Sequence, residues 1–259
     1  MNNDSALKAL LVVGLTSLLC SVVVTTAAVA LKPIQRAYED LERNRVLVGI
    51  AGLTEDAAAL SDREVVSLFQ DLEARIVNLD TGKFDDGYDA DTFDGSADLA
   101  LSVPIPPEQD LATLGQRSRL ITVFVVPDGD GFSRMILPVY GQGMWSTLYG
   151  FIALDADLNT IAGITFYQQA ETAGIGDQIL RPDWQALWLG RKLYDPEGNL
   201  RFRVSKQAVD PALPAAAYHV DAISGATVTT DAVSNLITYW FGEHGFKPFI
   251  DSLTERSES

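Results

Sequence analysis

The longest apolar stretch of the chain runs from Ala9 to Leu31 and contains no charged residue. As an α-helix it would be roughly 35 Å long, which is enough to cross the hydrocarbon core of a membrane. Two interpretations fit this pattern. Ala28-Val29-Ala30 resembles a signal-peptidase site after a short basic start, which is typical of a cleaved signal peptide. We favour a retained, single-pass anchor at residues 9–31 after a short tail at 1–8, because the stretch is long and a helical pattern follows it directly.

The charges that flank this stretch bear on its orientation. The four basic residues that follow it outnumber Lys8 and the amino terminus: they are Lys32, Arg36, Arg43 and Arg45. The positive-inside rule would therefore keep the C-terminal part of the chain in the cytoplasm. On these residues alone the side of the membrane stays open.

Helical spacing continues after the anchor. Pro33 is suited to the first position of a helix, and an apolar stripe, interrupted by Arg45, follows at Ile34, Tyr38, Leu41 and Val48. Ser61 to Glu64 has the capping-box pattern and precedes apolar residues at helical spacing: Val65, Leu68, Phe69, Leu72 and Ile76. Arg75 to Leu79 favours a short strand. These patterns predict a stalk and a second, half-buried helix.

An acidic segment follows between residues 80 and 98, with Asp80, Asp85, Asp86, Asp89, Asp91, Asp94 and Asp98. Its spacing departs from that of a calcium-binding EF-hand loop, and the closing glutamate is missing, which favours a solvated loop. We therefore expect residues 32–118 to form a helical stalk and an acidic loop region packed on the main domain.

From residue 119 the pattern changes to short apolar runs separated by turn residues. This pattern predicts two hairpins, a short helix, a further strand and a last helix, at residues 120–126 with 133–140, 149–154 with 160–167, 183–189, 200–205 and 230–241. Helices packed on antiparallel strands define an α+β domain, which we place at residues 119–259.

Composition excludes several classes of function. The net charge of −16 argues against nucleic-acid binding, which depends on basic surfaces. The one cysteine, Cys20, excludes an internal disulfide and four-cysteine iron–sulfur ligation. With only His219 and His244, a histidine-rich metal site is excluded as well, and His219 is expected to be a polar surface or supporting residue. There is no nucleophile elbow, Walker loop or Gly-x-Gly-x-x-Gly fingerprint, so neither hydrolase chemistry nor an NADH site is expected.

Three stretches remain that packing alone does not explain: Gly141–Tyr149, Gln169–Gly176 and Asp221–Thr227. In the first, Trp145 follows two glycines that we expect to need special backbone angles. The third lies just ahead of a predicted helix, where free backbone N–H groups favour a phosphate. Together the stretches offer what a flavin requires: an aromatic wall, polar loops and a phosphate-binding position.

At this point the residues resemble a known family. Asp221 to Thr227 resembles the flavinylation motif D-x-x-[S/T]-G-A-T. Glu171 to Gly176 is similar to that family's E-T-P-G-L-G, with Ala173 in place of proline and Ile175 in place of leucine. Three more segments are similar to family motifs: Gly143–Ser146 with Tyr149-Gly150, Tyr239–Gly242 and Gly245–Phe249. The resemblance runs from the anchor to about residue 250. It is to the C subunit of the sodium-translocating NADH:quinone oxidoreductases more than to the related G subunit of Rnf complexes.

The resemblance implies a cofactor and a set of site residues. FMN would be carried covalently, through a phosphoester bond, by Thr227 after transfer from FAD by a flavin transferase, with Asp221 and Ser224 as recognition elements beside Gly225 and Ala226. The residues expected to line the flavin are Trp145, Glu171, Thr172, Gly174, Ile175 and Lys206. For Lys206, an exposed lysine at a strand end is an equal interpretation. No metal site and no catalytic residue is expected.

The resemblance also implies a place of action. The chain would be a single-pass inner-membrane protein with its soluble domain in the periplasm, against the positive-inside count. It would relay electrons between other membrane and redox subunits of a sodium-pumping NADH:ubiquinone reductase, without an NADH site of its own. Two alternatives stay open: an Rnf-type subunit working with ferredoxin, and a membrane-anchored scaffold that keeps the fold without flavin.

Overall fold

The computed structural model describes residues 3–257 except residues 91, 94–97, 207–208 and 211. Asp91 and Asp94 of the predicted acidic loop therefore lie outside the described residues. The chain divides into a compact unit at Met1–Arg43 and another at Asn44–Ser259.

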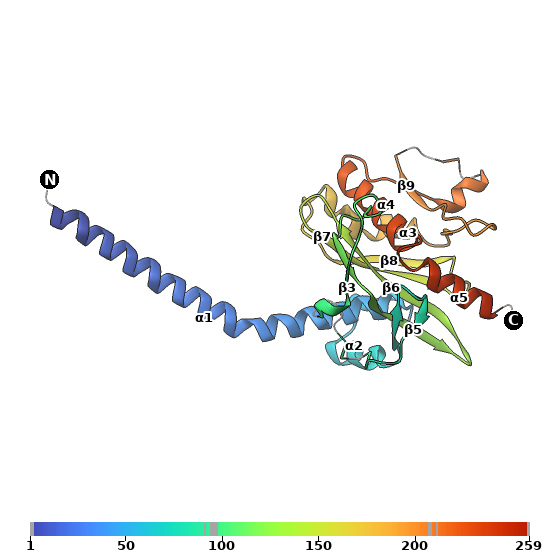
Figure 1. Cartoon of the computed structure of the whole chain (residues 1–259), viewed down its shortest axis with the longest axis horizontal. Coiled ribbons are helices and arrows are strands. Elements are labelled where there is room, and N and C mark those ends of the chain that lie inside the picture. Colours follow the sequence, from blue (N-terminus) through green and yellow to red (C-terminus); the bar gives the residue numbers. More distant parts are fainter. Residues whose placement is uncertain (1–2, 91, 94–97, 207–208, 211, 258–259) are drawn as a thin grey trace. The chain divides into compact units, whose positions relative to one another are not determined.

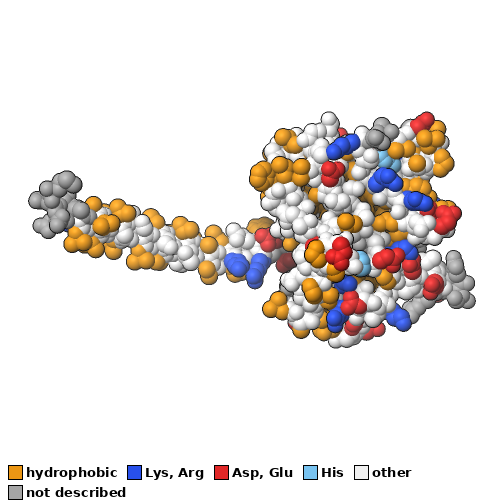
Figure 2. All heavy atoms as spheres, turned by 45° about the horizontal axis from the view of Figure 1, so that its top comes forward, with side chains coloured by type: hydrophobic (Ala, Val, Ile, Leu, Met, Phe, Trp, Pro, Cys, Tyr) orange, Lys and Arg blue, Asp and Glu red, His pale blue; other side chains and the backbone are white. Residues whose placement is uncertain are grey.

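The first unit is helical and belongs to α1, which spans Asn3–Ile50 (Figure 1). Pro33 lies inside this helix, so the expectation that it opens a second helix is wrong. A proline removes only one backbone hydrogen bond, and the helix continues on both sides of it. Hydrophobic side chains cover α1 towards the N-terminus, where they are exposed (Figure 2). Among the described residues, the stretch from Leu7 to Ile50 is the one helical segment long and apolar enough to cross a membrane.

The second unit is built on an antiparallel sheet. Within the described residues the sheet has six strands in the order β2-β1-β5-β6-β7-β8. Their bounds are β1 Glu73–Asn78, β2 Lys83–Phe84, β5 Leu120–Asp128, β6 Gly131–Gln142, β7 Thr147–Asp155 and β8 Ile161–Gln168. Both predicted hairpins are therefore present, as β5–β6 and β7–β8. The α+β class predicted from the alternating apolar pattern is confirmed.

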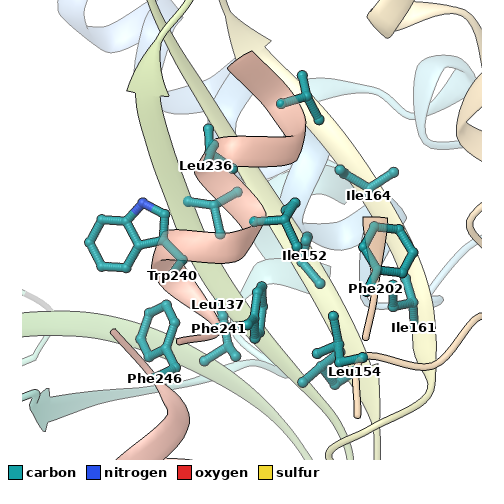
Figure 3. Close-up of a cluster of buried hydrophobic side chains, with 14 of the residues drawn as sticks. Leu137, Ile152, Leu154, Ile161, Ile164, Phe202, Leu236, Trp240, Phe241 and Phe246 are labelled. Atoms are coloured by element: carbon teal, nitrogen blue, oxygen red, sulfur yellow. The ribbon is translucent and has the colours of Figure 1, made fainter. Parts of the chain in front are cut away.

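Two helices cover one face of this sheet. They are α4, at Thr227–Trp240, and α5, at Lys247–Ser257. Leu236 and Trp240 of α4 lie over Leu137 and Ile152 of the sheet (Figure 3). The Trp240 indole N–H also donates to the Tyr140 carbonyl at 2.7 Å. This layer fixes α4, and the segment that leads into it, on the sheet.

The opposite face carries a smaller core. Phe124, Ile136 and Phe151 alternate with residues of the first face, as the two-residue period of strands requires. Leu47, in the last turns of α1, packs there together with Phe69 of helix α2 (Asp62–Phe69). α2 begins with the predicted capping box at Ser61.

Arg45, which interrupts the apolar stripe of α1, has a structural role in this layer. Its guanidinium donates to the carbonyl oxygens of Leu60 at 2.6 Å and Ala57 at 3.1 Å, and to the Asp62 carboxylate at 3.0 Å. The hydrogen bonds of Arg45 thus connect the end of α1 to the start of α2 and to η1, a 3-10 turn at Ala57–Ala59.

Small elements complete the unit. Strands β3 (Ser102–Pro104) and β4 (Gln116–Ser118) pair antiparallel, whereas β9 (Arg203–Ser205) and β10 (His219–Asp221) pair parallel. The predicted strand at 200–205 is therefore shorter than expected, and the sequence pattern did not predict its parallel partner. The remaining short helices are η2 Leu99–Leu101, η3 Gly176–Leu180, α3 Pro182–Ala186 and η4 Pro214–Tyr218.

Three helix predictions need correction. The helix predicted from Ser61 ends at Phe69, and Ile76 lies in β1, where it is buried as a strand residue. The helix predicted at 183–189 is the shorter α3. The last helix begins at Thr227 rather than at residue 230. The buried hydroxyl of Thr230 donates to the Ala226 carbonyl at 2.8 Å, so this polar group has a partner within the first turn.

Candidate functional site

The first turn of α4 is the centre of the site. Thr227 is its first residue, and its side chain is exposed. The turn before it is held by buried Ile223 and Ala226, while Gly225, at φ +83°, has open space around it. Among the described residues, no side chain caps this helix. The first backbone N–H groups of α4 thus keep their capacity to bind an anion, which the helix dipole also favours.

Asp221 ends β10 and introduces this turn. Its carboxylate lies 3.0 Å from His219 Nε2, and its carbonyl accepts a hydrogen bond from the Trp184 indole N–H at 3.0 Å. His219 is buried. The imidazole expected at the surface or in a supporting position therefore supports Asp221 from inside the fold.

Glu171 connects the first two stretches that the sequence singles out with the first turn of α4, where the third stretch ends. Its buried carboxylate accepts the backbone N–H of Met144 at 2.9 Å and of Trp145 at 3.1 Å through Oε1. Its other oxygen, Oε2, accepts the hydroxyl of Thr229 in the first turn of α4. The loop between β6 and β7, the loop after β8 and the start of α4 therefore meet at one carboxylate.

The loops are also joined at the surface. The Trp145 indole N–H donates to Thr172 Oγ1 at 3.0 Å, and Ser146 Oγ accepts the backbone N–H of Ala170 at 2.8 Å. Trp145 as a residue is 65% exposed, which is unusual for so large an apolar side chain.

Further apolar side chains are exposed on the same segments. Met144, Ile175 and Val228 are each about half exposed, the first two within the first two stretches and Val228 directly after the third. An exposed apolar cluster beside an uncapped helix start fits a ligand with a flat apolar part and an anionic part. FMN has both, so the residues present fit this cofactor.

The other predicted residues lie around this cluster. Gly174 has φ +74° and open space beside it, so the backbone there can come close to a ligand. Lys206 Nζ lies 3.7 Å from Asp231 of α4, and both side chains are largely exposed. Because Asp231 follows Thr227 by four residues, the two share one face of the helix. Lys206 is thus placed one helical turn from Thr227.

The glycines of the first stretch have a different explanation from the one expected. Neither Gly141 nor Gly143 has a positive φ. A side chain at Gly141 would meet Ala112, and one at Gly143 would meet Glu171 Oε1 at 2.7 Å. Close approach, rather than a special backbone angle, favours glycine at both positions.

Several residues of the site were not found from the sequence. Thr229, Met144 and Val228 carry contacts or exposed surface here, and none of them stands out in the sequence. Thr229 follows Thr227 by two residues, but its burial against Glu171 depends on a loop 58 positions earlier in the chain. Within the described residues no group of acidic, histidine or cysteine side chains could hold a metal ion.

Known proteins match this fold and site. The FMN-binding domain family matches residues 143–242, which include most of the first stretch and all of the other two, so the class is that of proteins with an FMN-binding domain. The C subunit of the Na(+)-translocating NADH-quinone reductase of Pseudomonas aeruginosa is 42% identical over 97% of both chains. That of Vibrio anguillarum is 39% identical over 98% of this chain and 97% of its own. This chain therefore belongs to the C-subunit family of the Na(+)-translocating NADH-quinone reductases.

Solved structures agree with this assignment. NqrC of Shewanella oneidensis superimposes with a TM-score of 0.74 at 33% identity, over 85% of this chain and 99% of its own. The C subunit from Parabacteroides distasonis gives a TM-score of 0.58 at 26% identity, over 83% of this chain and 96% of its own. The family predicted from the flavinylation motif is confirmed, and the relatives favour the NADH-quinone reductase family over the Rnf-type alternative.

Proposed function

We propose that this chain is the FMN-carrying subunit of a sodium-pumping NADH:quinone reductase, with FMN joined to Thr227 by a phosphoester bond. The observation that best supports this proposal is the exposed Thr227 at an uncapped helix start, beside exposed apolar side chains from three segments. Bound FMN accepts and donates electrons, and the protein supplies its position and surroundings.

The attachment is a group transfer without oxidation or reduction. Thr227 Oγ forms a bond to the FMN phosphorus of FAD while the phosphoanhydride bond to AMP breaks. The hydroxyl proton is lost and AMP leaves, so atoms and charge balance. A flavin transferase is the partner for this step, with Asp221 and Ser224 as its recognition elements. His219 holds the Asp221 carboxylate in one orientation for this recognition.

Each remaining site residue has a role towards the bound cofactor. The N–H groups of the first turn of α4 bind the phosphate, and Gly225 and Ala226 give it room and support. The side chains of Trp145, Thr172 and Ile175 line the ring, while Gly174 lets the backbone approach it. Lys206, beside Asp231, offsets part of the phosphate charge.

The N-terminal helix supports a membrane location. We propose residues 9–31 as the membrane anchor, 32–118 as the stalk and acidic loop region and 119–259 as the flavin domain. The domain faces the periplasm of an inner membrane, with partner subunits overriding the positive-inside count. Electrons then pass between redox groups of neighbouring subunits, and the NADH and quinone sites lie outside this chain.

The flavin assignment has a direct test. Protein made with a flavin transferase should give a fluorescent band on a denaturing gel and an intact mass raised by one FMN minus one water. Thr227→Ala should lose both signals, whereas Thr92→Ala, a change at an exposed threonine outside the site, should keep them. A fluorescent Thr227→Ala band excludes the attachment site. Colourless wild-type protein made with active transferase favours the flavin-free scaffold.

Orientation can be tested with one introduced thiol. Cys20 is the single cysteine of the chain, so Cys20→Ser with Asp130→Cys places one thiol in the exposed β5–β6 turn. A membrane-impermeant maleimide should label it in cells whose outer membrane has been permeabilised. Labelling only after the inner membrane is broken would place the domain in the cytoplasm.

A further inference from the structure

Glu171 is the residue whose role goes beyond the family pattern. We propose that Glu171 is a positioning residue that holds the flavin-bearing start of α4 to the loop carrying Trp145, and does not itself bind FMN. This inference rests on the proposed attachment at Thr227. The buried carboxylate of Glu171 would fix the position of Thr227, the attachment point, relative to the indole of Trp145.

Both carboxylate oxygens of Glu171 accept hydrogen bonds from the protein itself. Oε1 accepts from the two successive backbone N–H groups of Met144 and Trp145, and Oε2 accepts from Thr229. The residue is 7% exposed, and no lysine or arginine pairs with it in the part of the chain that the structure describes. These donors satisfy a buried carboxyl group, so losing them would be costly.

Two glycines lie close to the same carboxylate. A side chain at Gly143 would come within 2.7 Å of Glu171 Oε1. A side chain at Gly176 would come within 2.7 Å of Thr229 Oγ1 and 2.9 Å of Glu171 Cβ. The loops at Gly143 and Gly176 therefore approach Glu171 and its partner closely, and at Gly143 the Ser146 carbonyl and Leu148 are also within 2.9 Å of an added side chain. This close approach favours glycine at both positions, whereas the sequence pattern led us to expect special backbone angles at Gly143.

We call the hydrogen bonds of Glu171 to Met144, Trp145 and Thr229 the junction. The junction affects both the attachment point and the aromatic wall of the flavin site. Thr229 lies in the same helical turn as Thr227, so its bond to Glu171 fixes the rotation of that turn and the direction of the Thr227 hydroxyl. The bond to the Trp145 N–H fixes the backbone from which the indole projects. Because group transfer depends on placement to within about 1 Å, the rate of flavin attachment should depend on Glu171.

The test compares two substitutions of different severity in the full chain. Glu171→Ala leaves three donors without an acceptor. Glu171→Gln keeps an acceptor oxygen for the two N–H groups and offers an amide N–H to Thr229. With limiting transferase and excess FAD, Glu171→Ala should slow attachment about tenfold or more. Glu171→Gln should stay within about threefold of wild type, since neutral hydrogen bonds replace charged ones.

A second readout and a control separate positioning from stability. Circular dichroism of the attached flavin in the visible region, per bound FMN, should change in Glu171→Ala and be restored in Glu171→Gln. Ile136→Ala, in the core on the other face of the sheet, also lowers the melting temperature but should keep the native rate and spectrum. Equal slowing in Ile136→Ala would overturn the inference, as would a native rate and spectrum in Glu171→Ala.

Thr229 supplies the decisive pair if Glu171→Ala does not fold. Thr229→Val removes one bond of the junction and should slow attachment, whereas Thr229→Ser keeps the hydroxyl and should restore it. A native rate in Thr229→Val refutes the role proposed for the junction. None of these outcomes bears on the attachment site itself, which stands or falls with Thr227→Ala.

Discussion

Thr227 and Thr229 lie two residues apart in the first turn of α4, and their hydroxyl groups have opposite environments. Thr227 is exposed, whereas Thr229 is 2% exposed and donates to the buried carboxylate of Glu171. One hydroxyl is free to react with a ligand from solvent, and the other fixes the turn from which the first projects. The two threonines are therefore expected to respond differently to substitution.

Stability should depend on Thr229 and not on Thr227. Thr229→Val keeps the shape of the side chain but removes the donor to Glu171, so we expect a loss of about 1–3 kcal/mol in the free energy of unfolding. Thr227→Val, at an exposed position, should change it by less than about 0.5 kcal/mol. Urea unfolding of the two variants, followed by tryptophan fluorescence, measures both. Equal stability of the two variants would contradict the buried bond.

We expect the exposed indole of Trp145 to affect the fluorescence of the bound flavin. If the indole lies against the ring, it should quench flavin fluorescence, and Trp145→Ala should brighten the emission per attached FMN severalfold. Attachment at Thr227 should persist in this variant, because the indole N–H bonds only Thr172. Trp145→Phe, which keeps an aromatic ring, should be intermediate. Unchanged emission in Trp145→Ala would place the ring elsewhere.

The sequence predicted the parts of the fold that are governed by local pattern. Strands β5 to β8 are eight residues or longer, carry apolar runs and are separated by recognisable turns, so both hairpins were found. The parallel pairing of β9 with β10 joins two three-residue strands, which carry too little pattern to be recognised. The start of α4 was missed because Thr227 to Thr230 are all β-branched and read as poor helix formers.

For the candidate site, the sequence indicated which residues are exposed more readily than which ones bond to each other. Thr227, Trp145 and Ile175 are exposed, as a flavin-binding surface requires. Glu171 and His219 differ, because a polar residue's burial depends on segments distant in the chain. No local sequence pattern indicates that Glu171 accepts hydrogen bonds from the β6–β7 loop and from the first turn of α4. None indicates that His219 is bonded to Asp221.

Arg45 should matter more for stability than its exposed ion pair suggests. Asp62, its carboxylate partner, is 70% exposed, so that pair alone contributes little. The bonds to the Ala57 and Leu60 carbonyls are part-buried. Arg45→Ala removes the guanidinium from both, and the Ala57 carbonyl then keeps only the backbone N–H of Leu60 as a donor. We expect a loss of about 1–3 kcal/mol in the free energy of unfolding, measured by urea titration. Arg63→Ala, at an exposed position on α2, is the control and should change it by less than about 0.5 kcal/mol. Similar values for both variants would contradict the structural role of Arg45.

The raised pKa of Tyr140 leads us to expect that the domain loses stability at alkaline pH. Burial, reinforced by the neighbouring Tyr239 and Tyr149, raises the pKa of Tyr140 from 10.0 to about 12. A group whose pKa is higher in the folded than in the unfolded state contributes stability below the unfolded pKa and loses it as pH rises through the folded pKa.

The native domain should therefore lose stability between pH 10 and about 12, in part because of this phenol. Tyr140→Phe keeps the ring that lies 4.7 Å from Trp240, measured between ring centroids, and removes the ionisable hydroxyl. Melting temperatures of the two proteins from pH 8 to 12 should differ by a constant amount up to pH 10, above which the native protein should fall faster. Parallel curves over the whole range would show that Tyr140 ionises as freely in the folded state as in the unfolded one.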